Sequence, residues 1–119
     1  MFKVMLLVKR KPGMSMEDFV DYYENVHAAR DKSGSGIVHY ARHYLRPAPS
    51  FTDDETAEPP FDAVTEVWYS DRAAYDAIRE KLVQKPAWVA DVVADEERFM
   101  DRARCRTVFV DSRVSEMHP

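Results

Sequence analysis

A chain of 119 residues, of which 45% are hydrophobic and 32% are charged, has the composition of one globular domain. This profile excludes disordered and collagen-like chains. The 17 basic and 21 acidic side chains sum to a net charge of −4, so we expect no nucleic-acid partner and no membrane partner. Because Cys105 has no partner for a disulfide and the first residues lack the order of a secretory signal, we expect a cytoplasmic protein.

Apolar periodicity divides residues 1–119 into the strands and helices of a single domain. Strands are predicted over residues 2–10, 37–46, 61–69 and 106–110. Helices are predicted from residue 16 to about residue 30 after a cap at Ser15, after a cap at Ser70 or Asp71, and from Pro86. Residues 48–60 form an acidic, proline-containing segment that we expect to be a loop near a pocket mouth, and residues 112–119 are expected to be a tail.

The order of these elements is βαββαβ with an accessory helix. It predicts an α+β fold of the ferredoxin-like class, in which helices cover one face of a four-stranded antiparallel sheet. Apolar residues occur on both faces of the first and third predicted strands, with Met5 and Leu7 opposite Val4 and with Trp68 beside Val67. An apolar face without helices needs another cover, so we expect a homodimer that packs through the uncovered face.

Short motifs with a fixed order run through most of the chain. They are KVMLLVKRKPGMSMEDFVDYYENVHA at residues 3–28, FDAVTEVWYSDRAAYDA at 61–77, and DEERFMD at 95–101 followed by RTVFV at 106–110. In these motifs the chain resembles the EthD family of dimeric α+β barrel proteins. The resemblance implies a ferredoxin-like sandwich that pairs into a dimeric α+β barrel, and it matches His27 to a histidine of the family's helix. It also implies lyase, cyclase or isomerase chemistry without a cofactor.

His27 is the leading candidate for a catalytic residue. It follows Phe19 and Tyr23 at helical spacing, which places its imidazole on the apolar face of the first predicted helix. An enclosed imidazole can serve as a general acid or base near neutral pH. The alternative is a core histidine that binds a backbone carbonyl.

Alternation along the second predicted strand leaves two possible partners for His27. Tyr40 and Tyr44 share one face of this strand, whereas His43 lies on the other. The resemblance to the isomerase branch of the family, through Gly36 at the start of the strand, favours Tyr40. A phenol at that position would stabilise an enolate. With the opposite register, His43 replaces Tyr40.

The spacing of His39 and His43 would suit a metal ion on a helix but not on a strand. At about 3.3 Å per residue the two histidines are roughly 13 Å apart, so we expect no metal site. The chain also has no nucleotide-binding or serine-hydrolase motif, and we expect no cofactor.

A largely aromatic set of residues is predicted to line a cavity for a small hydrophobic or aromatic molecule. Each member taken singly could also fill the core. The set consists of Phe19, Tyr23, Tyr44, Val67, Tyr69, Trp88 and Phe99. By the resemblance, Val67 stands where the isomerase branch carries a cysteine, so thiol chemistry is not expected.

Three functions are consistent with these residues. The leading prediction is a cofactor-independent lyase, isomerase or cyclase that removes a proton next to a carbonyl group of a small aromatic or polyketide-like compound, with His27 as the base. The second is a non-catalytic ligand-binding accessory subunit of an oxygenase pathway. The third is a cofactor-free monooxygenase. Loss of turnover without loss of binding on substitution of His27 would single out the first.

Overall fold

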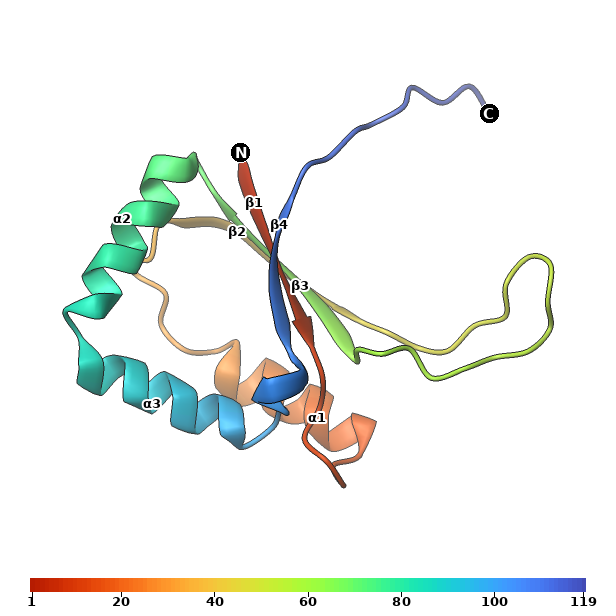
Figure 1. Cartoon of the computed structure of the whole chain (residues 1–119), viewed down its shortest axis with the longest axis horizontal. Helices are drawn as coiled ribbons and strands as arrows, with labels where there is room; N and C mark the ends of the chain where they lie inside the picture. Colours follow the sequence, from red (N-terminus) through yellow and green to blue (C-terminus); the bar gives the residue numbers. More distant parts are fainter.

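Four antiparallel strands form the sheet of the computed structural model, which describes residues 1–119 (Figure 1). The strands are β1 (Phe2–Val8), β2 (Ile37–Tyr44), β3 (Ala63–Tyr69) and β4 (Arg106–Val110). Their order across the sheet is β2-β3-β1-β4, so β3 and β1 occupy its centre. This order, with the helices packed on one face, confirms the predicted ferredoxin-like α+β fold.

Three helices and two shorter helical turns connect the strands. They are α1 (Met16–Tyr22), the π-helical turn η1 (Tyr23–His27), α2 (Arg72–Val83), α3 (Pro86–Glu97) and the 3₁₀ turn η2 (Arg102–Arg104). Ser15 caps α1 by accepting a hydrogen bond from the Asp18 amide at 3.1 Å, and Asp71 caps α2 through the Ala74 amide at 2.8 Å. Pro86 occupies the first position of α3, as predicted. None of the helices has the length and apolarity needed to cross a membrane.

Two clusters of buried side chains fill the space between the sheet and the helices. The larger cluster consists of Val8, Phe19, Tyr23, Ala63, Phe99 and Met100. The smaller cluster consists of Val4, Val67 and Tyr69, with Tyr40, Tyr75 and Ile78 among the side chains packed against it. Alternate residues of β1 and β3 contribute to both clusters, so strand alternation determines which face the helices cover.

A β-bulge near the start of β2 departs from regular alternation. The pairing of β2 with β3 shifts between Ile37 and His39, and the extra residue, Val38, is 53% exposed. Because the bulge absorbs one residue, Ile37 and Tyr40 both pack toward the helices. The bulge therefore sets the face on which Tyr40 lies.

The phenyl ring of Phe19 lies at the centre of the larger cluster and is 0% exposed. We predict that Phe19→Ala lowers the free energy of unfolding by about 3–5 kcal/mol, because the substitution removes buried apolar surface and leaves a cavity. Denaturant unfolding followed by circular dichroism measures this change. Val83→Ala is the matched control, since Val83 is 82% exposed on α2 and its substitution should change the free energy by less than about 0.5 kcal/mol. Equal effects of the two substitutions would contradict the described core.

Candidate functional site

The π-helical turn η1 determines where the side chains at the end of α1 point. The Ala28 amide donates to the Tyr23 carbonyl at 2.7 Å, which closes a turn one residue wider than an α-helical turn. The Lys32 ammonium then donates to the carbonyls of Ala28 and Arg30, at 2.7 and 3.1 Å, and caps the end of the turn. The helical segment therefore ends at His27, three residues before the end that we predict from its periodicity.

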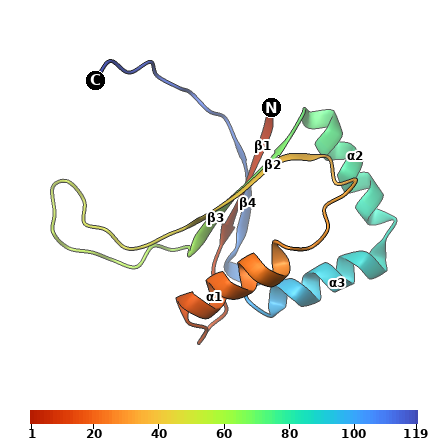
Figure 2. The same cartoon turned by 180° about the vertical axis from the view of Figure 1, so that it is seen from behind.

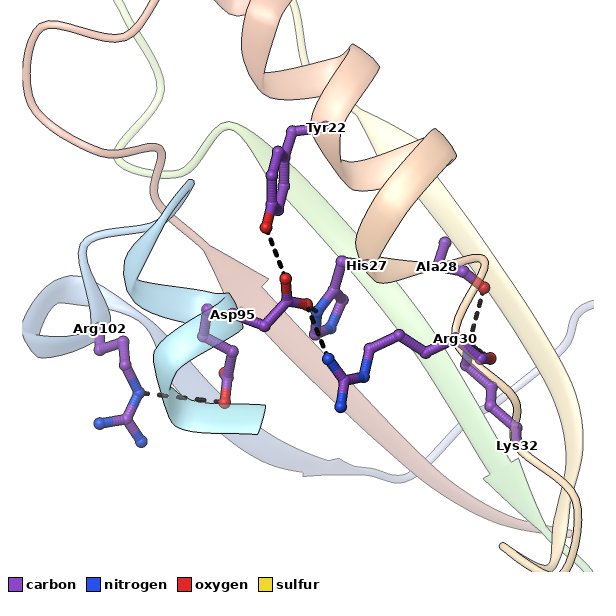
Figure 3. Close-up of polar contacts among 8 residues, drawn as sticks. Tyr22, His27, Ala28, Arg30, Lys32, Asp95 and Arg102 are labelled. Carbon is purple, nitrogen blue, oxygen red and sulfur yellow. Dashed lines mark hydrogen bonds and ion pairs between the residues drawn. The ribbon is translucent and has the colours of Figure 1, made fainter. Parts of the chain in front are cut away.

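A buried carboxylate from α3 binds three side chains of this segment (Figure 3). One oxygen of Asp95 accepts a hydrogen bond from the Tyr22 hydroxyl at 2.6 Å, and the other lies 2.7 Å from Nδ1 of His27. The guanidinium of Arg30 is 3.7 Å from the second oxygen. Burial opposes ionisation of Asp95, but the hydrogen bonds from Tyr22 and His27 and the positive charge nearby outweigh it and hold the pKa of Asp95 below its ordinary value.

This contact sets the chemistry available to His27. When Nδ1 donates its hydrogen to the Asp95 carboxylate, the second ring nitrogen, Nε2, is left to accept or return a proton. The carboxylate also stabilises the imidazolium that forms after protonation. Sequence reasoning singled out His27 but gave no role to Asp95. The available signal was the DEERFMD motif, which begins at this residue.

Aromatic rings enclose the imidazole of His27. Its ring centroid lies 5.0 Å from that of Phe99 and 5.5 Å from that of Tyr23. The side chains of Phe19, Tyr23 and Phe99 are fully buried, so the structure places these three predicted substrate-binding residues in the packed core around His27. The side chain of His27 itself is 18% exposed.

Tyr40 lies on the helix-covered face of β2, as preferred from the sequence. The ammonium of Lys32 is 4.5 Å from the centroid of its ring, and the guanidinium of Arg42 is 4.9 Å from the same ring. Burial and the neighbouring Tyr23 raise the pKa of Tyr40, so its phenol remains protonated at neutral pH and can donate a hydrogen bond. Tyr23 in turn shares a hydrogen bond of 2.5 Å with Thr65 on β3.

An ion pair attaches the same face of β2 to η1. Arg42 donates to both carboxylate oxygens of Glu24, at 2.8 and 2.7 Å, and the Tyr44 hydroxyl donates to Glu24 as well. The hydrogen bonds from Arg42, opposed by burial and aided by Tyr44, lower the pKa of Glu24 to about 2. Tyr44 therefore helps to hold β2 against η1 through Glu24, and its ring packs against the larger cluster.

His43 lies on the opposite face of the sheet and is not brought together with His27. Its Nε2 is 3.4 Å from a carboxylate oxygen of Glu66, and Nε2 of His39 is 3.0 Å from the same oxygen. The observed register thus removes the alternative in which His43 replaces Tyr40. The separation of roughly 13 Å estimated along a strand does not hold for the ring nitrogens, because both imidazoles lean toward the carboxylate between them.

A cavity of about 260 Å³ lies between β3, α2, α3 and residues 31–35. Two predicted substrate-binding residues, Tyr69 and Trp88, line it, whereas Val67 is buried in the smaller cluster. The lining does not include His27 or Tyr40, but it includes Lys32, which contacts both the end of η1 and the ring of Tyr40.

The acidic loop over residues 48–60 is not at the mouth of this cavity. It extends from the sheet on the side away from α2 and α3, as both views show (Figures 1 and 2). Our expectation that the loop borders the pocket was therefore wrong. The β2–β3 connection leaves the strand ends opposite the corner where α2 and α3 meet.

Comparisons with known proteins agree on one family and one fold. The EthD domain matches residues 11–103. The structure of HapK from Hahella chejuensis has a TM-score of 0.61 and 16% identity, over 100% of this chain and 99% of that chain. An EthD-family protein from Bacillus halodurans has a TM-score of 0.60 and 13% identity, over 95% of this chain and 100% of that chain. A search of curated proteins found no match. At these identities the structural similarities show the fold alone.

The depressed pKa of Glu24 predicts a pH dependence of stability. The ionised pair with Arg42 stabilises the fold above the ordinary pKa of 4.5, and this contribution is lost as the pH falls toward about 2. We expect Glu24→Gln to be less stable than the unsubstituted protein by about 1 kcal/mol at pH 6, a value reduced by solvent screening of a partly exposed pair. The difference should vanish near pH 2.

Urea unfolding at several pH values measures this difference. The control is Glu116→Gln, an exposed glutamate in the tail, which should stay within about 0.5 kcal/mol of the unsubstituted protein throughout. A difference between Glu24→Gln and the unsubstituted protein that does not change between pH 6 and pH 2 would contradict the ion pair.

Proposed function

The chain belongs to the EthD domain family, as its motifs implied, and on this premise we propose that it is a cofactor-free enzyme that works by general acid–base chemistry. The substrate is a small aromatic or polyketide-like compound with a carbonyl group. His27 acts as the base that removes a proton from the carbon next to that carbonyl. The reaction that follows is an isomerisation, a cyclisation or a loss of water.

The observation that carries this proposal is the 2.7 Å contact between Nδ1 of His27 and the carboxylate of Asp95. For a histidine with a purely structural role, a backbone carbonyl would serve as the acceptor of the ring N–H. Here a carboxylate with a 5% exposed side chain occupies that place, and a carboxylate is costly to bury unless it is paired and hydrogen-bonded. The same arrangement orients a general base and stabilises its protonated form in other acid–base enzymes.

The steps balance with side chains that the chain itself supplies. Nε2 of His27 takes the proton, the electron pair of the broken C–H bond moves into the enolate, and Asp95 balances the new imidazolium charge. The neutral phenol of Tyr40 donates a hydrogen bond to the enolate oxygen. His27 then returns the proton to another carbon, or to a departing hydroxyl group that leaves as water.

The cavity supports binding of a compound of this size beside Lys32. Its volume of about 260 Å³ lies below the roughly 300–1,000 Å³ of pockets for drug-sized ligands, so one or two rings fit. To react, the substrate has to extend from the cavity past Lys32 to the exposed part of His27. Lys32 is thus the residue through which the two halves of the site connect.

A second candidate function is ligand binding without catalysis. One observation favours it: the residues that line the cavity include neither His27 nor Tyr40. In that role the cavity would hold a reactive intermediate for a partner enzyme, and the pair of His27 and Asp95 would serve only to join α1 to α3. The two functions differ in whether His27 affects turnover.

We predict that the unsubstituted protein accelerates exchange of deuterium from D₂O into the carbon next to the carbonyl group of its substrate. Proton nuclear magnetic resonance follows this exchange across a panel of aryl ketones and aryl-substituted lactones, with and without a carboxylate. General base catalysis contributes about 10²- to 10⁴-fold, so His27→Gln should slow exchange by that factor. Binding to the cavity should be unchanged in this variant.

The control for His27→Gln is His118→Gln, since His118 lies in the exposed tail and should exchange at the unsubstituted rate. Melting temperatures of both variants separate a catalytic loss from unfolding. Exchange that persists in His27→Gln contradicts the role of His27. Binding without any accelerated exchange favours the non-catalytic function.

We further propose that the protein is a homodimer that packs through the sheet face opposite the helices. That face carries Met5, Leu7, Trp68 and Val108, together with the cluster of His39, His43 and Glu66. Apolar side chains on the two extended segments are also exposed: Phe51 at 112%, Val114 at 93% and Met117 at 78%. A second copy would cover both sets, and a stable pair buries about 1,500 Å² or more in total.

Light scattering coupled to gel filtration should therefore give the mass of a dimer at micromolar concentration. Val108→Asp places a charge on the uncovered face and should shift the population to monomers, because burial of an unpaired carboxylate is unfavourable. Val83→Asp is the control, since Val83 is 82% exposed on α2, away from that face. A monomeric unsubstituted protein would rule out the dimer.

A further inference from the structure

Three lysines surround the cavity and give its mouth a positive charge. Lys32, Lys81 and Lys85 all line it, and none of them forms a salt bridge within the chain. The one acidic residue of the lining, Asp31, accepts hydrogen bonds from the amide and the hydroxyl of Ser33, at 2.9 and 2.6 Å. Its carboxylate is thus engaged by its own turn, and three ammonium groups have no carboxylate partner.

The beginning of α3 adds to this positive field. Lys85 precedes the 12-residue helix and its side chain makes no capping hydrogen bond. The first amides of an uncapped helix are unpaired and form the positive end of its dipole. Trp88, in the first turn, lines the same cavity, so this end of α3 lies at the cavity wall.

Besides these charged residues and the turn of Ser33, Gly34 and Ser35, four apolar or aromatic side chains line the cavity. They are Ile78 and Leu82 on α2, Trp88 on α3 and Tyr69 on β3. Trp88 is 46% exposed, so a ligand would cover a ring that water now contacts. A cavity with aromatic walls and an excess of ammonium groups is suited to a flat apolar molecule that carries a negative charge at one end.

On the basis of the function proposed above, we propose that the ligand of this cavity is an aromatic carboxylate. Its ring system packs between Trp88 and Tyr69, and its carboxylate meets the ammonium groups of Lys81 and Lys85 at the beginning of α3. The opposite end of the ligand, which carries the carbonyl group, then points along residues 31–35 toward His27. A neutral compound of the same shape makes the same apolar contacts but leaves the ammonium groups of the lysines without a partner.

Isothermal titration calorimetry with two probes of matched shape tests this assignment. The probes are 2-naphthoate, which is an anion, and 2-naphthalenemethanol, which is neutral. We expect 2-naphthoate to bind at least about tenfold more tightly, as two charge-assisted contacts would provide. In Lys81→Gln/Lys85→Gln the advantage of the anion should disappear, whereas the affinity for the neutral probe should stay within about twofold.

The control variant is Lys11→Gln/Arg113→Gln, which removes the same net charge at exposed positions outside the cavity and should keep the preference for the anion. Equal affinity for the two probes, a preference that survives in Lys81→Gln/Lys85→Gln, or failure of both probes to bind would each overturn the assignment. His27→Gln should bind 2-naphthoate like the unsubstituted protein, so this test does not depend on catalysis. Binding of 2-naphthoate together with absent deuterium exchange would leave the ligand class intact and remove the enzymatic function.

Discussion

The carboxylate of Asp95 is the constraint on which the arrangement of this site depends. It is the only buried residue of α3, and a buried carboxylate is unstable without partners. Tyr22, His27 and Arg30 supply those partners from a distant part of the sequence, since His27 and Asp95 are 68 residues apart. The pairing therefore fixes α3 against α1 and η1 and fixes the orientation of the His27 ring in one step.

The cavity exists because α2 and α3 make few buried contacts with the rest of the protein near the point where they meet. No residue of α2 is fully buried, although Tyr75 and Ile78 pack against the smaller cluster, and α3 is attached near its end by Asp95. Between these two attachments, the junction of α2 and α3 lies away from the sheet (Figure 1). Apolar side chains of the corner, such as Val83 and Trp88, consequently remain exposed. The cost of that exposure is offset only when a ligand or another molecule covers them.

The fold was predictable from the sequence because its signals are local. The caps at Ser15 and Asp71, the proline at the start of α3 and the alternation of β3 each depend on residues within a few positions of one another. For β2, alternation left two possible faces, and the resemblance to the family favoured the face that carries Tyr40. These features left only the ends of elements uncertain.

The geometry of the site was less predictable because it depends on contacts between distant segments. The helical spacing of Phe19, Tyr23 and His27 does not distinguish an α-helical turn from the wider turn of η1, which one hydrogen bond of Ala28 defines. The role of Asp95 cannot be read from an acidic motif, since other acids of the same helix, Asp91 and Glu97, are exposed. Likewise, an aromatic residue such as Phe99 has the same sequence signal whether it lines a cavity or fills the core.

Lys32 shows how one side chain can serve the fold and the cavity together. An ammonium group has three donors, and the carbonyls of Ala28 and Arg30 take two of them. The ammonium also lies 4.5 Å from the centroid of the Tyr40 ring, and Lys32 is among the residues that line the cavity. A ligand in the cavity can therefore contact Lys32 without breaking the hydrogen bonds that end η1. Those hydrogen bonds hold the turn that carries His27, so a ligand can bind in the cavity without displacing the base. Lys32 takes part in both, because it caps the turn and lines the cavity.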